Sequence, residues 1–137
     1  MNYGKKNIST GLILMSLFMA YGFLLIYLRD FSPNKVEWIE NSNDGAHFEA
    51  KLAHVHGNLF ALLNVILGYL LLKINIDENS KKYISILLLV GMFMPIGILA
   101  ELIFGVPPVL VLVGAISMIA GVAYFGYSIA SLKSKEV

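Results

Sequence analysis

The chain contains no cysteine, a single tryptophan and only 14% charged residues. Without cysteine it has no disulfide and no thiolate metal site. About one quarter of the residues of a soluble domain are charged. A chain with this little charge and 58% hydrophobic residues is therefore not expected to keep a hydrated surface. The formal net charge of +1 provides no basic patch, so no nucleic-acid partner is predicted.

What the sequence has instead is four long apolar segments. With their polar flanks, they predict helices over residues 8–28, 45–72, 83–104 and 109–132. Each is close to the ~20 residues that cross ~30 Å of hydrocarbon as a helix. A chain of 137 residues leaves no room for a second domain. We therefore predict an all-α integral membrane protein, with one four-helix bundle of transmembrane helices over residues 1–137 in a lipid bilayer.

The charges between the apolar segments predict the orientation of the chain. Seven lysines fall on one side of the membrane: Lys5, Lys6, Lys73, Lys81, Lys82, Lys133 and Lys135. The other side has only Arg29, Lys35 and Lys51, in or beside a polar loop of about residues 30–44. By the positive-inside rule, both termini lie in the cytoplasm and the loop lies outside. The expected location is the cell (inner) membrane.

The second helix is expected to begin near Gly45, and its two faces differ. At about 100° per residue, one face collects small and amide residues such as Asn58, which suit contacts between helices. The opposite face carries leucines, including Leu63, Leu67 and Leu70, which we expect against lipid. His54 lies on the first face and His56 points about 200° away from it, so the two cannot bind the same metal ion.

The histidines are the candidate ligands, because an ionisable residue inside a membrane usually has a function. His54 and His56 are the candidate cofactor or metal ligands. His47, about 10 Å further along the helix axis, is the third. Glu101 is expected to lie at the depth of His54, where its carboxylate would hydrogen-bond the imidazole or carry a proton. Asn58, one turn from His54, is the other expected neighbour.

Small residues and one proline predict how the helices pack. Gly11 and Gly22 are the expected close-contact points on the first helix. Pro95 is expected to kink the third helix, because it breaks a backbone hydrogen bond. On the fourth helix, a stripe that includes Gly114 and Gly121 is expected to face the other helices.

The residues Ala53-His54-Val55-His56-Gly57-Asn58-Leu59 resemble a known haem-binding motif. They are similar to the haem-ligating His-x-His of the haem-copper oxidase catalytic subunit and of related small membrane proteins, including nitric-oxide-response proteins. In that group the two histidines bind two different haems. The resemblance therefore implies haem b, with His54 and His56 as axial ligands, and electron transfer or chemistry of oxygen or nitric oxide. This chain has no counterpart of the copper-site histidines of those oxidases. The alternative to haem as the bound cofactor is copper or zinc.

Two other interpretations stay open. Four spans with a histidine and asparagine early in the second helix are similar to the membrane-associated glutathione and eicosanoid enzymes, which implies a glutathione-transferase-like enzyme. Those enzymes use several arginines, whereas this chain has only Arg29. The chain could also be a non-catalytic accessory or assembly subunit. Because one small bundle has little interior volume, we expect a homo-oligomer or a larger membrane complex. No residue pattern in the sequence identifies a catalysed reaction, so whether the protein is an enzyme stays open.

Overall fold

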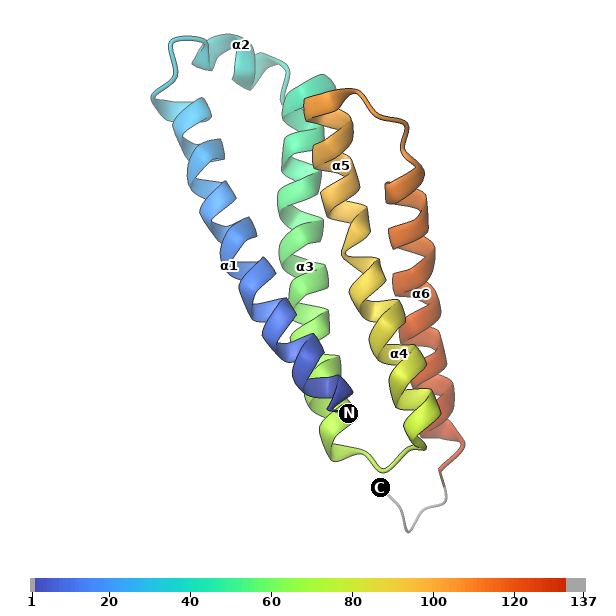
Figure 1. Ribbon diagram of the computed structural model, residues 1–137. Coiled ribbons are helices and arrows are strands. Elements are labelled where there is room, and N and C mark those ends of the chain that lie inside the picture. Colours follow the sequence, from blue (N-terminus) through green and yellow to red (C-terminus); the bar gives the residue numbers. More distant parts are fainter. Residues whose placement is uncertain (1, 133–137) are drawn as a thin grey trace.

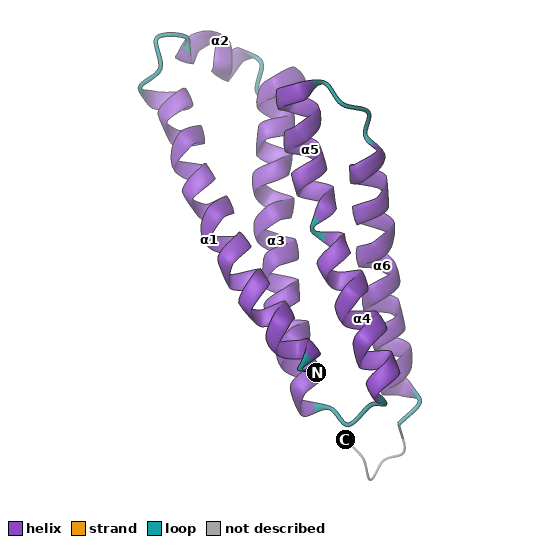
Figure 2. Cartoon of the chain, in the orientation of Figure 1, coloured by secondary structure: helices purple, strands orange, loops and turns teal. Residues whose placement is uncertain are grey.

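The computed structural model describes residues 2–132, which form six α-helices and no strand (Figures 1 and 2). The helices are α1 (Tyr3–Asp30), α2 (Lys35–Glu40), α3 (Gly45–Lys73), α4 (Glu78–Gly91), α5 (Phe93–Phe104) and α6 (Val109–Ala130). Because α4 and α5 follow one another as a single rod, the chain has four long helical units. The predicted all-α fold with four long helices is confirmed. Lys133 and Lys135, which contribute to the orientation prediction, lie outside the described residues.

The four units are long and apolar enough to cross a membrane. They contain 28, 29, 27 and 22 residues, compared with the ~20 that a bilayer requires. Large apolar side chains cover their outer faces, and Leu17, Phe23 and Ile119 are 61%, 74% and 70% exposed. Apolar surface on this scale is unfavourable in water and suits contact with lipid. The chain is a multi-pass membrane protein.

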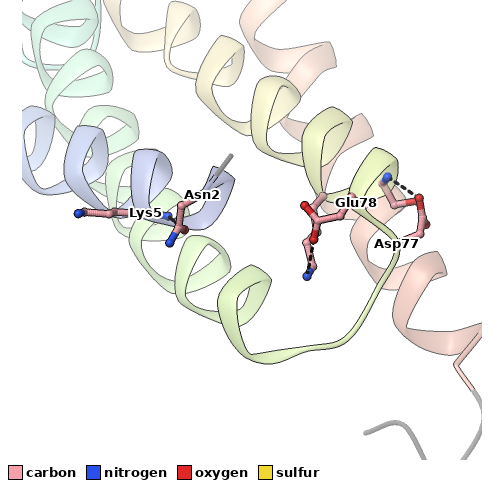
Figure 3. Close-up of polar contacts among 6 residues, drawn as sticks. Asn2, Lys5, Asp77 and Glu78 are labelled. Carbon is pink, nitrogen blue, oxygen red and sulfur yellow. Dashed lines mark hydrogen bonds and ion pairs between the residues drawn. The ribbon is translucent and has the colours of Figure 1, made fainter.

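Two helices begin earlier than the apolar segments do. α1 and α4 each begin five residues before the predicted starts at residues 8 and 83. The Asn2 side chain accepts a hydrogen bond from the backbone N–H of Lys5 (3.1 Å), and the Asp77 side chain accepts one from the N–H of Ser80 (2.9 Å), as Figure 3 shows. These caps satisfy N–H groups that the helix leaves free. Capping residues, and not hydropathy, therefore set where these helices begin.

The third rod is interrupted at Met92, between α4 and α5 (Figure 2). Pro95 has no N–H to donate to the carbonyl of Gly91, and its ring crowds that carbonyl. The N–H of Met92 bonds instead to the carbonyl of Leu89 at 3.1 Å, which tightens the turn. The predicted effect of Pro95 is confirmed.

α3 lies at the centre of the bundle, packed against α1 on one side and α4 and α5 on the other. Its buried residues recur every three or four positions: Ala50, Ala53, Gly57, Ala61, Asn64, Gly68 and Leu71. Leu63, Leu67 and Leu70 are partly buried against the core around Leu88 and Phe125. Their predicted exposure to lipid is wrong, because a helix with neighbours on two sides keeps only a narrow face for lipid.

At the end where α1 begins, α1 and α3 are in very close contact. A Cβ atom on Gly4 would lie 2.3 Å from the carbonyl oxygen of Gly68, and one on Gly11 would lie 2.7 Å from that of Ala61. Real side chains do not fit at such distances, so only glycine allows this approach. The predicted close contact at Gly11 is confirmed.

A polar network lies at the same end of the bundle. Asn7 donates to the side-chain oxygen of Asn64 (2.8 Å) and to the carbonyl of Ser85 (3.2 Å), whose hydroxyl donates back to Asn7. Asn64 donates to the carbonyls of Phe60 (3.0 Å) and Leu88 (2.9 Å). Both asparagines are completely buried. All the side-chain N–H groups of the two asparagines have acceptors, so neither amide leaves an unpaired donor in the apolar interior. These bonds hold α1, α3 and α4 together.

Towards α2 the same two helices separate, and α1 leans away from α3 (Figure 1). The ring of Phe18 packs closely against Gly57, where a Cβ atom would lie 2.3 Å from the ring. Beyond Phe18, α2 and its flanking turns connect the separated helices. This separation creates the space described next.

Candidate functional site

The candidate site is a pocket between the separated halves of α1 and α3. Its volume is about 740 Å³, within the range of about 300–1,000 Å³ that is usual for cofactor sites. From α1 it is lined by Met19, Gly22, Phe23, Leu25, Ile26 and Arg29. From α3 it is lined by His47, Lys51, His54, Val55 and Asn58. We call it the α1–α3 pocket.

The imidazole of His54 is held by a backbone carbonyl of α1. Its Nδ1 lies 2.9 Å from the carbonyl oxygen of Phe18. A carbonyl oxygen can only accept, so Nδ1 carries the proton, and in the neutral imidazole Nε2 then keeps its lone pair. Within residues 2–132, Nε2 has no hydrogen-bond partner, and it is not buried. Histidines that bind metals are often held in the same way, with the second nitrogen fixed by a backbone carbonyl.

Gly22 provides the space for this ring. A Cβ atom at Gly22 would lie 2.7 Å from Cε1 of His54 and 3.4 Å from its Nε2. The predicted close contact at Gly22 is therefore confirmed, and its partner is the imidazole. Asn58 donates to the carbonyl oxygen of His54 at 2.9 Å and lines the pocket below it.

His47 and Lys51 connect the same pocket to the α2 region. The ring of His47 stacks on Trp38 with centroids 4.3 Å apart and planes 13° apart, and its Nδ1 hydrogen-bonds the carbonyl of Trp38. Lys51 donates to the carbonyl of Ser42. Because α3 is continuous, His47 lies about 10 Å from His54 along the axis. The two histidines line one pocket without converging on one point.

Glu101 is not brought to His54. The hydrogen bond and the ring contacts of His54 are made with Phe18, Tyr21 and Gly22 of α1. Glu101 lies on α5, half-buried, and its carboxylate forms no hydrogen bond or ion pair with any residue from 2 to 132. The site therefore lies between α1 and α3, and its expected position beside Glu101 is wrong. The physical reason is that Gly22 leaves a gap on α1 that the imidazole fills.

His56 has separate surroundings and does not line the α1–α3 pocket. Its Nδ1 donates to the carbonyl of Leu52 in its own helix at 2.9 Å, and its ring meets Phe60 edge-on with centroids 6.0 Å apart. Across residues 2–132, no group of three or more histidine or acidic side chains lies close enough together to hold a metal ion.

Two residues that contribute to the pocket and to the polar network, Lys51 and Asn7, are not among the predicted site residues. Lys51 lies three residues before His54 and four after His47, and this helical spacing is the signal that places it on the same face. Asn7 precedes the predicted start of the first helix. Its partners Asn64 and Ser85 are 57 and 78 residues away along the chain, so no local pattern reveals the network.

No protein-family model matches this sequence, and neither a curated protein nor a solved structure matches it. The function proposed below therefore rests on the geometry of the α1–α3 pocket.

Proposed function

We propose that the protein binds haem b in the α1–α3 pocket, with Nε2 of His54 as an axial ligand. The observation that carries this proposal is the hydrogen bond between Nδ1 of His54 and the carbonyl oxygen of Phe18. The Nε2 of His54 stays accessible and unpaired at the wall of a pocket of cofactor size. Haem bound through histidine supplies one-electron chemistry or binding of small gases such as oxygen or nitric oxide.

The surrounding residues suit such a ligand. The bond to Phe18 fixes the orientation of the imidazole and increases the basicity of Nε2. Met19, Phe23 and Val55 give the pocket apolar walls that suit the apolar face of a porphyrin. A single copper or zinc ion would need about three or four protein ligands. Haem brings its own four nitrogen ligands and needs only the imidazole, so it fits the described residues better.

The location of the site is part of the proposal. Among the described residues, five lysines lie at the end of the bundle where α1 begins (Lys5, Lys6, Lys73, Lys81 and Lys82), whereas the α2 end has Arg29, Lys35 and Lys51. We therefore place the α1–α3 pocket on the outer side of the cell membrane. The pocket is open on one side. We therefore expect a second copy of the chain, or another subunit of a membrane complex, to cover a bound haem.

The test is the visible spectrum of the purified protein in detergent after haem is supplied, oxidised and reduced. Wild type and His56→Ala should show a Soret band, and His54→Ala should lose it. His56→Ala is the matched control, because it removes an imidazole from the same helix outside the pocket. Elemental analysis separates iron from copper and zinc.

Two results would contradict haem binding by His54. One is a wild-type protein that stays colourless when haem is supplied, and the other is an equal spectrum in both variants. A colourless, metal-free protein would favour a non-catalytic accessory subunit. Retention on a glutathione resin would favour the glutathione-transferase-like enzyme.

A further inference from the structure

The two charged residues that line the α1–α3 pocket, Arg29 and Lys51, lie at its α2 end. Arg29, His47 and Lys51 line this end, whereas Met19 and Gly22 line the part nearer Phe18. On α3, Lys51 lies one helical turn from His54 on the same face. No aspartate or glutamate lines the pocket. The end near α2 is thus cationic, and the remainder is mainly apolar.

The positive charges of Arg29 and Lys51 differ in whether a carboxylate lies beside them. The guanidinium of Arg29 makes two hydrogen bonds to the carboxylate of Asp30, at 2.9 and 2.8 Å, so its charge is paired. Lys51 is half-buried, and within residues 2–132 it donates only to the neutral carbonyl of Ser42 and forms no ion pair. An ammonium group removed from water without a counter-charge is unfavourable. The pocket therefore has one uncompensated positive charge beside its apolar part.

We propose that Lys51 binds a carboxylate of an amphiphilic ligand whose apolar body lies along α1 and α3 beside His54. An ammonium group has three donors, and Lys51 uses one of them on Ser42. A carboxylate in the pocket would supply the missing negative charge and accept the remaining donors. The inference rests on the proposed function, since it assigns the acidic groups of the same ligand. It does not depend on a metal, because Lys51 would bind the carboxylate of a metal-free porphyrin equally well.

The test uses metal-free protoporphyrin IX and its dimethyl ester, which lacks free carboxylates. Binding is followed by porphyrin fluorescence, with the full-length protein in phosphatidylcholine nanodiscs and empty nanodiscs as the blank. Lys51→Gln should weaken binding of the free acid about tenfold or more and leave binding of the ester unchanged. The unchanged ester also shows that the variant is folded. Lys35→Gln, which removes an exposed lysine of α2 outside the pocket, should change neither.

Three results would overturn the inference. The first is equal weakening of the acid and the ester by Lys51→Gln, which would indicate a general loss of the pocket. The second is no binding of either porphyrin to the wild type. The third is displacement of the free acid by phosphatidylglycerol in the nanodisc but not by added phosphatidylcholine, which would make a lipid phosphate the occupant.

The two proposals fail separately. If His54→Ala keeps the haem spectrum while Lys51→Gln weakens only the free acid, carboxylate binding stands and axial ligation by His54 is wrong. If His54→Ala loses the haem spectrum while Lys51→Gln affects neither porphyrin, haem binding stands and the role of Lys51 is wrong.

Discussion

The two ends of the α1–α3 pair differ, although they belong to the same two helices. At the end where α1 begins, glycines bring the backbones into contact and a Cβ atom at Gly4 would lie 2.3 Å from a carbonyl oxygen. At the α2 end, the same helices are separated by a pocket of about 740 Å³. We refer to these as the closed end and the open end.

The difference shows how one helix pair can combine stability and binding. At the closed end, the donors of Asn7 and Asn64 are all used by protein acceptors, so nothing remains for a ligand. At the open end, His54 uses one nitrogen to fix its ring and keeps the other free. Lys51 likewise lacks a counter-charge within the described residues. Polar groups whose hydrogen bonds are all made within the protein stabilise the closed end. Polar groups that keep free hydrogen-bonding capacity support the proposal that the open end binds a ligand.

The largest expected effect on the free energy of unfolding comes from a substitution that forces α1 and α3 apart at the closed end. In Gly68→Leu, the new Cβ would lie 2.8 Å from both the Asn7 Cβ and the Gly4 carbonyl oxygen. Because backbone atoms cannot move aside as side chains do, we expect a loss of about 1–3 kcal/mol or more in the free energy of unfolding. The measurement is unfolding in mixed detergent and sodium dodecyl sulfate.

Gly126→Leu is the matched control for Gly68→Leu. It makes the same substitution on α6, where a Cβ atom meets nothing within 4 Å. If the two variants unfold alike, close packing does not determine the stability of the closed end.

The second largest expected effect on the free energy of unfolding comes from breaking the polar network of Asn7 and Asn64. Asn64→Ala leaves Asn7 and the carbonyl of Leu88 without their partner, and we expect a loss of about 1–2 kcal/mol. Asn58→Ala removes a bond to a carbonyl of the same helix and a long contact, 3.5 Å, with Nδ1 of His54, and it should lose less than half of that. A double-mutant cycle of Asn7→Ala and Asn64→Ala should show coupling of about 1 kcal/mol. Additive losses would contradict a shared network.

Two identical substitutions on α1 should separate stability from binding. In Gly11→Ala the new methyl group meets the backbone of α3, whereas in Gly22→Ala it meets the ring of His54. We expect Gly11→Ala to lower the unfolding midpoint. Gly22→Ala should instead displace the imidazole and weaken haem binding about tenfold, as loss of a positioning group does, with little change in stability. Equal effects of both variants on haem titration would refute a distinction between the two ends.

The smallest expected effect on stability comes from the Asp77 cap of α4. Loss of this cap should leave both ends of the α1–α3 pair unchanged. Hydrogen bonding from Ser80, through its side chain and its backbone N–H, holds the pKa of the Asp77 carboxyl below its ordinary value. Its stabilising contribution is therefore complete above the ordinary pKa of about 3.9 and is lost as the pH falls through the lower, folded-state value. In acid, the unfolding midpoint of wild type should fall slightly more than that of Asp77→Asn. If the unfolding midpoints of wild type and Asp77→Asn fall in parallel with pH, the Asp77 carboxylate does not contribute to stability.

The sequence predicted which residues share a helix face better than it predicted the neighbours that the face contacts. The spacing of His54, Asn58 and the glycines on α1 identified the face of α3 that meets another helix, and Gly22 was an expected contact. Helical periodicity states which residues share a face, but it does not state which neighbour that face meets. Glu101 was therefore a reasonable partner for His54 by depth alone. The structure gives that position to the backbone carbonyl of Phe18, and a carbonyl leaves no mark in the sequence.

The sequence by itself determined the membrane-spanning helices, the break caused by Pro95 and the different directions of His54 and His56. These follow from hydropathy and from backbone geometry, which act within about one span of the chain. Only the tertiary structure decided that α1 and α3 touch at one end and separate at the other. It also decided that Asn7 pairs with Asn64, that Nδ1 of His54 hydrogen-bonds a carbonyl of α1 and that Lys51 faces the same pocket. These properties depend on contacts between residues far apart in the sequence, where one missing Cβ atom sets the distance between two helices.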